Sequence, residues 1–305
     1  NMTSLKKQTL KGIAFLGAGK SLGRVISFVN TLILARLLMP EDYGLMAMAM
    51  VVIGFVGFFN DVGLGSAIIQ RKEINQNQLS DVFFFSLIIS CLLCAGMYFV
   101  SPSVADFYEN DKITPILQVI SVTFILGSLK TVSEALMVKE MKFKYLSGIE
   151  FLTIIIQCAV TLLYAYWGHK TWALVYGLLA ASTVKLVLTC ILAKWKPSFH
   201  FNLKESISLL TFGATVTYSR VTWFLYTNSQ TLILGKLVGD KKTGVFSMAQ
   251  TFADLPTAHI TSLVIQVASP LFSKLQDDLS ALNHALIRLT AGLSLLTFPV
   301  LVGML

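Results

Sequence analysis

Basic side chains recur on one face of an apolar segment near the start of the sequence. Lys20, Arg24 and Ser27 belong to a series spaced by three or four positions, which places side chains on one face of a helix. The full series is Gly17, Lys20, Arg24, Ser27 and Thr31. Ammonium and guanidinium groups bind concentrated negative charge well, above all where the local dielectric constant is low. The chemistry this pattern indicates is the binding of an anion inside an apolar segment.

A second polar series lies two hundred positions later. It consists of Thr217, Arg220, Phe224, Thr227 and Thr231, and Arg220 takes the place of Lys20. A charge near the centre of a bilayer costs about 2.5–3.5 kcal/mol. Lys20 lies near the end of its segment and can avoid this cost by snorkelling, with its ammonium group at the membrane surface. Arg220 lies in the middle of its segment, so snorkelling explains its position poorly. We therefore expect Lys20, Arg24 and Arg220 to line a cationic cavity, with Ser27 and Thr227 on the same faces; snorkelling or ion pairing within the packing is the alternative.

Other charges inside apolar segments are less informative. Lys130 and Glu134 are four positions apart on one predicted helix, so we expect them to pair. For Lys185, snorkelling and an ion-pair or coupling role are the alternatives. Asp61 is expected to cap its helix or to hold a structural partner. Asp254, followed by a helix-kinking proline, either pairs with Arg220 or carries a coupling proton; pairing is the favoured interpretation.

Cysteine usage indicates no metal or redox chemistry. Cys91 and Cys94 form a C-x-x-C pattern inside an apolar run, without a second pair of ligands. Such cysteines usually serve as small apolar residues on a helix. The sequence also offers no nucleophile–base pair and no phosphate-binding loop, so we expect neither a cofactor nor an enzymatic activity.

The elements that must position these side chains are membrane spans. Of the 305 residues, 55% are hydrophobic and 13% are charged, and mean hydropathy is +0.71. Soluble proteins carry about 25% charged residues. The net charge of +8 lies mostly in short loops between apolar runs, which argues against nucleic acid as a partner.

Nine apolar runs are long enough to span a bilayer, and an all-α transmembrane fold follows. They cover roughly residues 12–38, 43–66, 81–102, 114–137, 148–168, 171–193, 207–235, 243–268 and 287–305. Most basic residues in the connecting segments share a side if the N-terminus is cytoplasmic, as the positive-inside rule requires. Lys236, Lys241 and Lys242 then lie on the outer side, against that rule.

The chain contains an internal repeat. Residues 31–50 (TLILARLLMPEDYGLMAMAM) align without a gap with residues 231–250 (TLILGKLVGDKKTGVFSMAQ), and the identities include Gly44 with Gly244. The first span then corresponds to the seventh, so the repeat unit has six spans and both copies share one orientation. We expect two pseudo-symmetric six-helix lobes, residues 1–200 and the start of a second lobe at 201–305, which holds about three spans fewer than a complete lobe.

Three segments resemble a known family. Residues 34–45 (LARLLMPEDYGL), 60–71 (NDVGLGSAIIQR) and 137–144 (MVKEMKFK) resemble the loops and helix ends of Wzx-type polysaccharide flippases, in the subgroup of colanic acid exporters. The family belongs to the multidrug/oligosaccharidyl-lipid/polysaccharide exporter superfamily. The first two motifs are specific, the third is looser, and the resemblance covers essentially the whole chain.

The resemblance implies a function. Such proteins move an undecaprenyl-pyrophosphate-linked oligosaccharide from the cytoplasmic to the periplasmic leaflet of the bacterial inner membrane. Their partners are that lipid-linked substrate, the membrane lipids, and the polymerase and export machinery of the same pathway. Alternating access would rock one lobe against the other. The family's cationic cavity maps by position to Lys20, Arg24 and Arg220.

Other interpretations fit the sequence less well. An ion-coupled multidrug antiporter of the same superfamily binds organic cations and would require carboxylates in the cavity, whereas the first polar face carries cations. A membrane polymerase or ligase would require a long catalytic loop, and the predicted loops are short. A membrane assembly factor without transport activity is disfavoured only by the repeat and the charged series.

Overall fold

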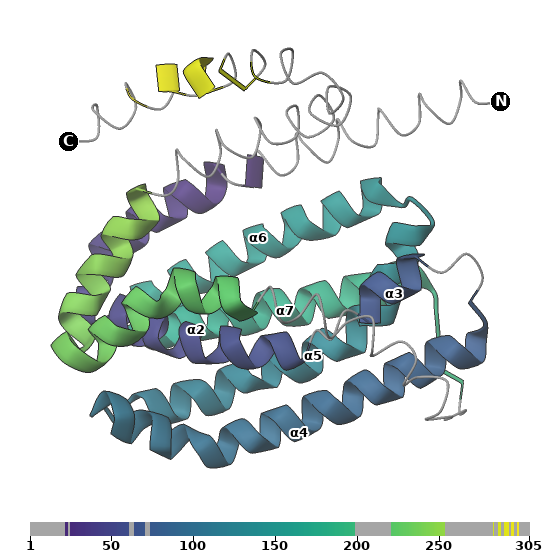
Figure 1. The fold of residues 1–305 in the computed structure, drawn as a ribbon, viewed down its shortest axis with the longest axis horizontal. Helices are drawn as coiled ribbons and strands as arrows, with labels where there is room; N and C mark the ends of the chain where they lie inside the picture. Colours follow the sequence, from purple (N-terminus) through teal and green to yellow (C-terminus); the bar gives the residue numbers. More distant parts are fainter. Residues whose placement is uncertain are drawn as a thin grey trace. The chain divides into compact units, whose positions relative to one another are not determined.

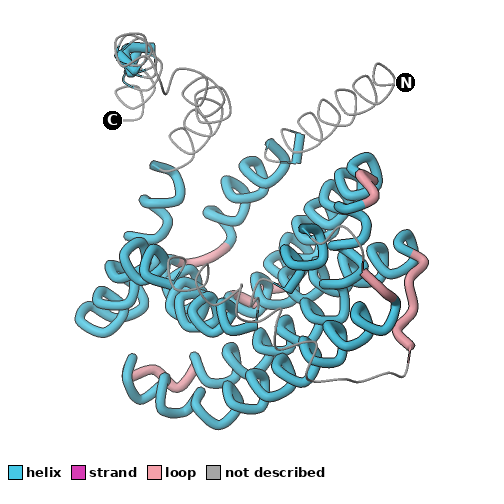
Figure 2. The backbone as a smooth tube through the Cα atoms, turned by 45° about the vertical axis from the view of Figure 1, so that its right-hand side comes forward, coloured by secondary structure: helices cyan, strands magenta, loops and turns pink. Residues whose placement is uncertain are grey.

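The described part of the chain is helical throughout. The computed structural model describes residues 22–23, 25–60, 64–70, 74–198 and 221–253, with single positions between 283 and 298. Figure 2 shows these residues as helices joined by short loops. The chain forms two compact units, residues 1–244 and 245–305. The helices and contacts described below belong to the first unit.

Within the described residues, five helices are long and apolar enough to cross a membrane. They are α2 (Pro40–Asn60), α4 (Gln76–Tyr108), α5 (Ile113–Lys139), α6 (Phe143–Tyr166) and α7 (Thr171–Ala193). They correspond to the predicted second to sixth spans. The short helix α3 (Leu64–Gln70) follows α2, a shorter apolar helix covers Val25–Leu37, and residues 221–253 are also helical. The predicted first, seventh, eighth and ninth spans lie partly outside the described residues.

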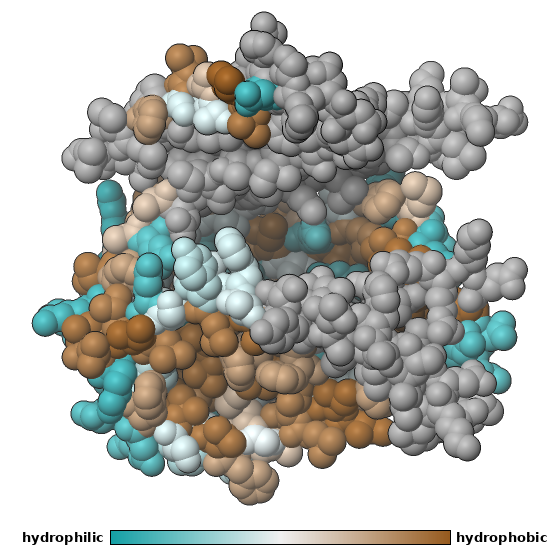
Figure 3. Space-filling view, viewed as in Figure 1, coloured by the Kyte–Doolittle hydropathy of each residue, from teal (hydrophilic) through white to brown (hydrophobic). Residues whose placement is uncertain are grey.

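Large apolar side chains cover the outside of these helices. Phe99 is 78% exposed and Leu92 is 66% exposed. In both α6 and α7, 22% of the most apolar stretch is buried within the protein. Figure 3 shows apolar residues across the middle of the described face and hydrophilic residues towards its two sides. Apolar surface on this scale requires lipid as the surrounding solvent, so the protein crosses the membrane several times.

The core of the first unit is built around α5. This helix packs along α4 on one side and along α7 on another, and α6 packs along α7 (Figure 1). Met48 of α2, Leu117 and Ile120 of α5, and Val175 of α7 are fully buried in one cluster. The side chains of α2 and α5 thereby fix the position of α2, which forms one wall of the cavity described below.

The start of α2 is the helix terminus that the sequence predicts. Pro40 occupies the first turn, where its missing N–H costs nothing, and Glu41 and Asp42 lie near the positive end of the helix dipole. The buried Asp42 carboxylate accepts a hydrogen bond from the Met39 N–H at 3.0 Å. It also accepts bonds from the Thr171 N–H at 3.0 Å and from the Thr171 hydroxyl at 2.7 Å. One carboxylate therefore joins the first turns of α2 and α7.

Helix α4 is longer than the predicted span 81–102. A capping box between Asn75 and Gln78 starts it early. It also continues through Pro102, which has no N–H to donate to the Tyr98 carbonyl. The Ser101 hydroxyl donates to that carbonyl at 3.0 Å and the Gln118 amide of α5 donates to it at 3.5 Å. These side chains satisfy the carbonyl that the proline leaves free, so the helix persists to Tyr108.

Candidate functional site

Most of the predicted cationic series lies outside the described residues. This holds for Lys20, Arg24 and Arg220, and also for Asp61 and Asp254. Their roles therefore stay predictions. Ser27 and Thr227 are described, as are Lys130, Glu134 and Lys185.

The two hydroxyl residues of the series have local partners. The half-buried Ser27 hydroxyl is hydrogen-bonded with the thiol of Cys158 in α6, which places it against the neighbouring helix. The exposed Thr227 hydroxyl donates within its own helix, to the Trp223 carbonyl at 3.0 Å or the Phe224 carbonyl at 3.1 Å. Both donors are thus engaged within the protein, and the Thr227 oxygen also accepts a hydrogen bond from the Asn228 amide at 3.1 Å.

Lys130, Glu134 and Lys185 meet in one ionic cluster. The Glu134 carboxylate lies 2.6 Å from the Lys130 ammonium and 3.0 Å from the Lys185 ammonium. The Lys130–Glu134 contact is the predicted pair, and for Lys185 an ion pair is one of the alternatives that the sequence leaves open. Packing of α7 against α5 brings Lys185 to the carboxylate. Two cations share one anion, so the ion pairs reduce the cost of placing charge in apolar segments but leave one net positive charge in the cluster.

A cavity of about 440 Å³ lies between α2 and the helical residues 221–238. Its lining residues are Val51, Val52, Phe55, Phe224, Leu225, Asn228, Ser229, Leu232 and Ile233. The cavity therefore has one wall from α2 and one from a helical segment more than 150 positions later in the chain. Its surroundings are apolar membrane-spanning segments, and aliphatic and aromatic side chains dominate its lining.

The side-chain donors of this cavity are engaged in hydrogen bonds within their own helix. The Asn228 amide donates to the Phe224 carbonyl at 3.0 Å, and the Ser229 hydroxyl donates to the Tyr226 carbonyl at 3.0 Å. Neither donor is free to bind a phosphate or a sugar. In this arrangement the cavity is suited to hydrocarbon, because its lining is mostly apolar and a phosphate placed there would lose its hydration without gaining a side-chain donor.

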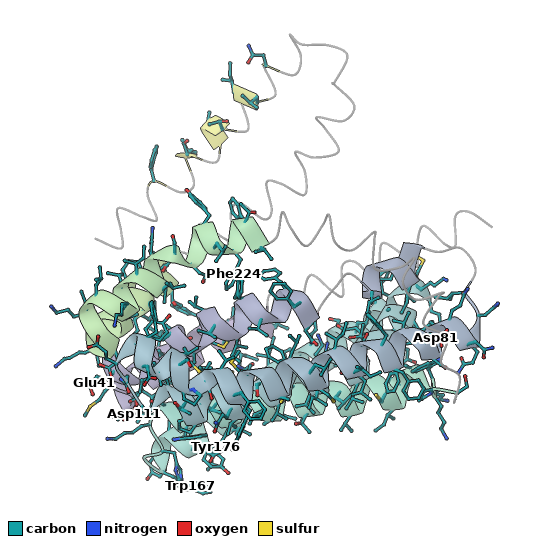
Figure 4. The ribbon with its side chains drawn as sticks, turned by 60° about the horizontal axis from the view of Figure 1, so that its bottom comes forward. Glu41, Asp81, Asp111, Trp167, Tyr176 and Phe224 are labelled. Carbon is teal, nitrogen blue, oxygen red and sulfur yellow. The ribbon has the colours of Figure 1, made fainter. Side chains whose placement is uncertain are left out.

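Phe224 lines one end of the cavity and also packs against α2 there. Its ring contacts Phe58 of α2 edge to face, with centroids 5.2 Å apart. A Cβ atom on Gly54 would lie 2.8 Å from the Phe224 Cζ, so α2 has no room for a larger residue there. Figure 4 shows Phe224 on the side of its helix that faces α2. This aromatic contact joins the helix that contains Phe224 to α2 near the C-terminal end of α2.

The two aligned glycines of the repeat touch each other. A Cβ atom on Gly44 would overlap the Asp240 carbonyl oxygen and would lie 3.0 Å from the Gly244 nitrogen. A Cβ atom on Gly244 would overlap the Pro40 carbonyl oxygen and would lie 2.9 Å from the Gly44 nitrogen. Pro40 and Asp240 are themselves aligned in the repeat. The contact is therefore reciprocal: each repeat presents the same backbone positions to the other.

Polar side chains surround this glycine contact. The Lys236 ammonium lies 2.6 Å from the Glu109 carboxylate, and the Asn110 amide donates to the Asp240 carboxylate at 3.0 Å. The hydrogen bond and the charge of Lys236 hold the pKa of Glu109 below its usual value of 4.5. We call Gly44, Gly244 and these four side chains the repeat junction. Lys236 goes against the positive-inside rule in the sequence, and its pairing with Glu109 offsets that charge.

Sequence patterns alone gave little sign of the repeat junction. The alignment of Gly44 with Gly244 and the outer position of Lys236 were the two available signals. Neither indicates that the turn between α4 and α5, where Glu109 and Asn110 lie, reaches the second repeat. That contact joins residues more than 120 positions apart.

Comparison with known proteins decides the family. Residues 33–305 match the family described as polysaccharide biosynthesis protein. The chain belongs to this family. The match covers all five described membrane-spanning helices, both walls of the cavity and the repeat junction.

Named relatives in the polysaccharide biosynthesis family agree with the resemblance seen in the sequence. The chain is 25% identical over 303 residues to the lipopolysaccharide biosynthesis protein WzxC of Escherichia coli, with 99% of this chain and 62% of WzxC covered. It is 25% identical over 305 residues to the teichuronic acid biosynthesis protein TuaB of Bacillus subtilis, with 99% and 63% covered. It is 24% identical over 279 residues to the succinoglycan biosynthesis transport protein ExoT of Rhizobium meliloti, with 92% and 56% covered.

These relatives confirm the predicted membership of the Wzx-type flippase family. With the five apolar helices, they also confirm a multi-pass protein of the bacterial inner membrane. The chain spans less than two thirds of the length of each of these three relatives. No solved structure matches the chain.

Proposed function

We propose that this chain is the larger part of a flippase that moves an undecaprenyl-pyrophosphate-linked oligosaccharide from the cytoplasmic to the periplasmic leaflet. The observation that carries the proposal is the family match over residues 33–305. The name of ExoT, a succinoglycan biosynthesis transport protein, supports transport of a polysaccharide precursor. The protein acts as a transporter and catalyses no covalent reaction.

The proposed mechanism is alternating access between two six-helix lobes. The six-span repeat of the sequence supports this arrangement, as does the reciprocal contact of Gly44 with Gly244. Rocking of one lobe against the other exposes the substrate site to one side of the membrane at a time. The substrate's prenyl tail stays in lipid between the lobes while its sugar crosses.

Lys20, Arg24 and Arg220 bind the pyrophosphate in this proposal. Their positions on equivalent faces of the first and seventh spans support a shared cationic cavity. The hydrocarbon-lined cavity beside Phe224 has no free donor for a phosphate, which is consistent with phosphate binding at a separate, cationic place. The neighbouring positions Ser27 and Thr227 complete the two polar faces.

Surface polymer in a strain without its own flippase tests the proposal. The full-length gene carries Lys20→Ala, Arg24→Ala or Arg220→Ala, each at matched membrane levels. Lys142→Ala is the control, because Lys142 pairs with Glu140 at a helix boundary, 2.6 Å away and outside the apolar segments. We expect the three variants to lose export and the control to retain it. Normal export by all three would contradict the cationic cavity.

Arg220→Lys separates two modes of phosphate binding. Lysine keeps the charge but loses the planar fork that contacts phosphate with two N–H groups. Export by this variant would indicate a point-charge role for Arg220. Loss of export at normal protein level would indicate a bidentate contact between Arg220 and the pyrophosphate.

A further inference from the structure

The repeat junction combines a very close backbone contact with weak side-chain contacts. The backbone at Pro40, where α2 begins, and the backbone at Asp240 come into contact because Gly44 and Gly244 have no side chains. Around them, Glu109 is 79% exposed in its ion pair with Lys236. Exposed ion pairs contribute little to stability, and a single hydrogen bond such as Asn110–Asp240 contributes about 1 kcal/mol. Separating the helices here would also part Gly235 from the core residues Met48 and Tyr108, because a Cβ atom on Gly235 would lie 3.1 Å from the Met48 Cγ and 2.6 Å from the Tyr108 Cε1. Opening of the junction would therefore expose part of that core.

The position of the junction places it between the cavity and one face of the membrane. On α2, Gly44 precedes the cavity residue Val51 by seven positions, and in the second repeat the cavity residue Ile233 precedes Asp240 by seven positions. At 1.5 Å per residue, the cavity begins about 10 Å from the junction along both helices. The junction lies at the ends of α2, α4 and α5 that the positive-inside rule assigns to the outer side.

We infer that the repeat junction is the closed outer gate of the transport pathway. This inference rests on the proposed transport function. In the described state, the glycine contact, the Lys236–Glu109 ion pair and the Asn110–Asp240 hydrogen bond seal the outer end. Opening to the outer side separates the backbone at Pro40 from the backbone at Asp240. It breaks the glycine contact, the ion pair and the hydrogen bond. The alternative role for such a contact is a fixed pivot, in which the same groups stay together while the lobes move.

Cross-linking distinguishes a gate from a pivot, because only a gate must separate. The full-length protein, with its native cysteines replaced by serine, carries Asn110→Cys and Asp240→Cys, joined by a reversible thiol cross-linker. We expect the cross-link to abolish export of surface polymer and a reductant to restore it. Normal export at a high yield of cross-linking would overturn the gate.

The control cross-link joins Ser80→Cys and Ser198→Cys. The two serine hydroxyls lie 2.9 Å apart at the opposite end of α4, within the first repeat. Because this pair does not bridge the two repeats, its cross-link should leave export unchanged. Loss of export by this control would mean that the cross-linking chemistry itself inactivates the protein. Loss of export by the Asn110–Asp240 cross-link would then count against the gate and not for it.

A labelling experiment tests the gate without relying on the cargo. Ser229→Cys places a thiol in the cavity lining, and a membrane-impermeant maleimide is added from the outer side. Gly44→Ala pushes a Cβ into the Asp240 backbone and should raise labelling several-fold, whereas the Asn110–Asp240 cross-link should lower it. Gly96→Ala is the matched control, because a Cβ there meets nothing within 4 Å.

The two readouts separate failure of the gate from failure of the proposed function. If labelling follows the state of the junction while no polymer is exported, the gate stands and the cargo is wrong. If labelling is the same in the Gly44→Ala, Gly96→Ala and cross-linked proteins, the gate is wrong even where export is normal. If Gly44→Ala fails to accumulate in the membrane, the Asn110–Asp240 cross-link alone tests the gate. The gate then requires that this cross-link lowers labelling of Ser229→Cys.

Discussion

The ring of Phe224 fills the space that a side chain on Gly54 would need. The two residues belong to different copies of the internal repeat, and the Phe224 Cζ would lie 2.8 Å from a Cβ on Gly54. Glycine on α2 and phenylalanine on the facing helix therefore form a complementary pair. The fit of this pair sets how closely the two helices approach at the inner end of the cavity.

Gly54→Ala should destabilise the protein by about 1–3 kcal/mol, because the added methyl group overpacks the contact with Phe224. Gly57→Ala is the control, since its nearest neighbour would be 3.9 Å from the new Cβ. Thermal unfolding of the purified protein in detergent measures the difference. Adding Phe224→Leu to Gly54→Ala should recover part of the loss; no recovery would show that the strain lies elsewhere.

Glu134→Gln should destabilise the protein more than Lys185→Met. The first change leaves Lys130 and Lys185 close together without their shared carboxylate, whereas the second leaves the Lys130–Glu134 pair intact. An ionic group left without its partner in such surroundings costs about 1–3 kcal/mol or more. Melting temperatures of the two variants, measured side by side, check the order. Equal effects would mean that the cluster contributes through packing alone.

Asp42→Ala should lower stability by about 0.5–2 kcal/mol or more, the range for losing a helix-capping side chain. The effect should exceed that of Glu41→Ala, because Asp42 also holds Thr171 at the start of α7. Chemical denaturation or thermal unfolding of both variants checks the comparison. A larger effect of Glu41→Ala would show that helix-dipole charge outweighs the hydrogen bonds.

The Lys236–Glu109 ion pair should persist to unusually low pH. The folded-state pKa of Glu109 lies below 4.5, so the pair contributes stability above the unfolded pKa and loses it as pH falls through the lowered folded value. The melting temperature of the unchanged protein should exceed that of Glu109→Gln at pH 6, and the two should converge below pH 4.5. Asp111→Asn, in the same loop, should not reproduce this convergence, and added salt should shrink the difference at pH 6.

Helix type, order and approximate bounds follow well from the sequence, because apolar run length and terminal signals are local. Pro40 and the acids after it mark the start of α2. The bounds of α4 do not follow, because a hydropathy window detects only the hydrocarbon part of a helix. Pro102 suggests an end, yet Ser101 and Gln118 satisfy the carbonyl that it leaves free. The partner Gln118 comes from another helix, so a local pattern cannot reveal it.

In the candidate site, too, local patterns predict some contacts and miss those that depend on packing between helices. Spacing of four positions predicts the Lys130–Glu134 pair, whereas the contact of Lys185 with Glu134 depends on how α7 packs on α5. The repeat aligns Gly44 with Gly244 but does not state that the two meet. Lys20, Arg24 and Arg220 lie outside the described residues, so the cationic cavity stays a prediction from spacing and family.

The length of α4 has a consequence for how the protein sits in its bilayer. Its 33 residues extend about 50 Å, while the hydrocarbon layer is about 30 Å thick. The ends of α4 must therefore enter the headgroup layers. At the predicted cytoplasmic end, Gln76 holds the segment after α7 through the Lys196 carbonyl at 2.6 Å and the Trp195 indole at 2.9 Å. The chain that follows α7 is thus anchored to the start of α4 at headgroup level, so its starting point moves with α4 when the bilayer changes in thickness.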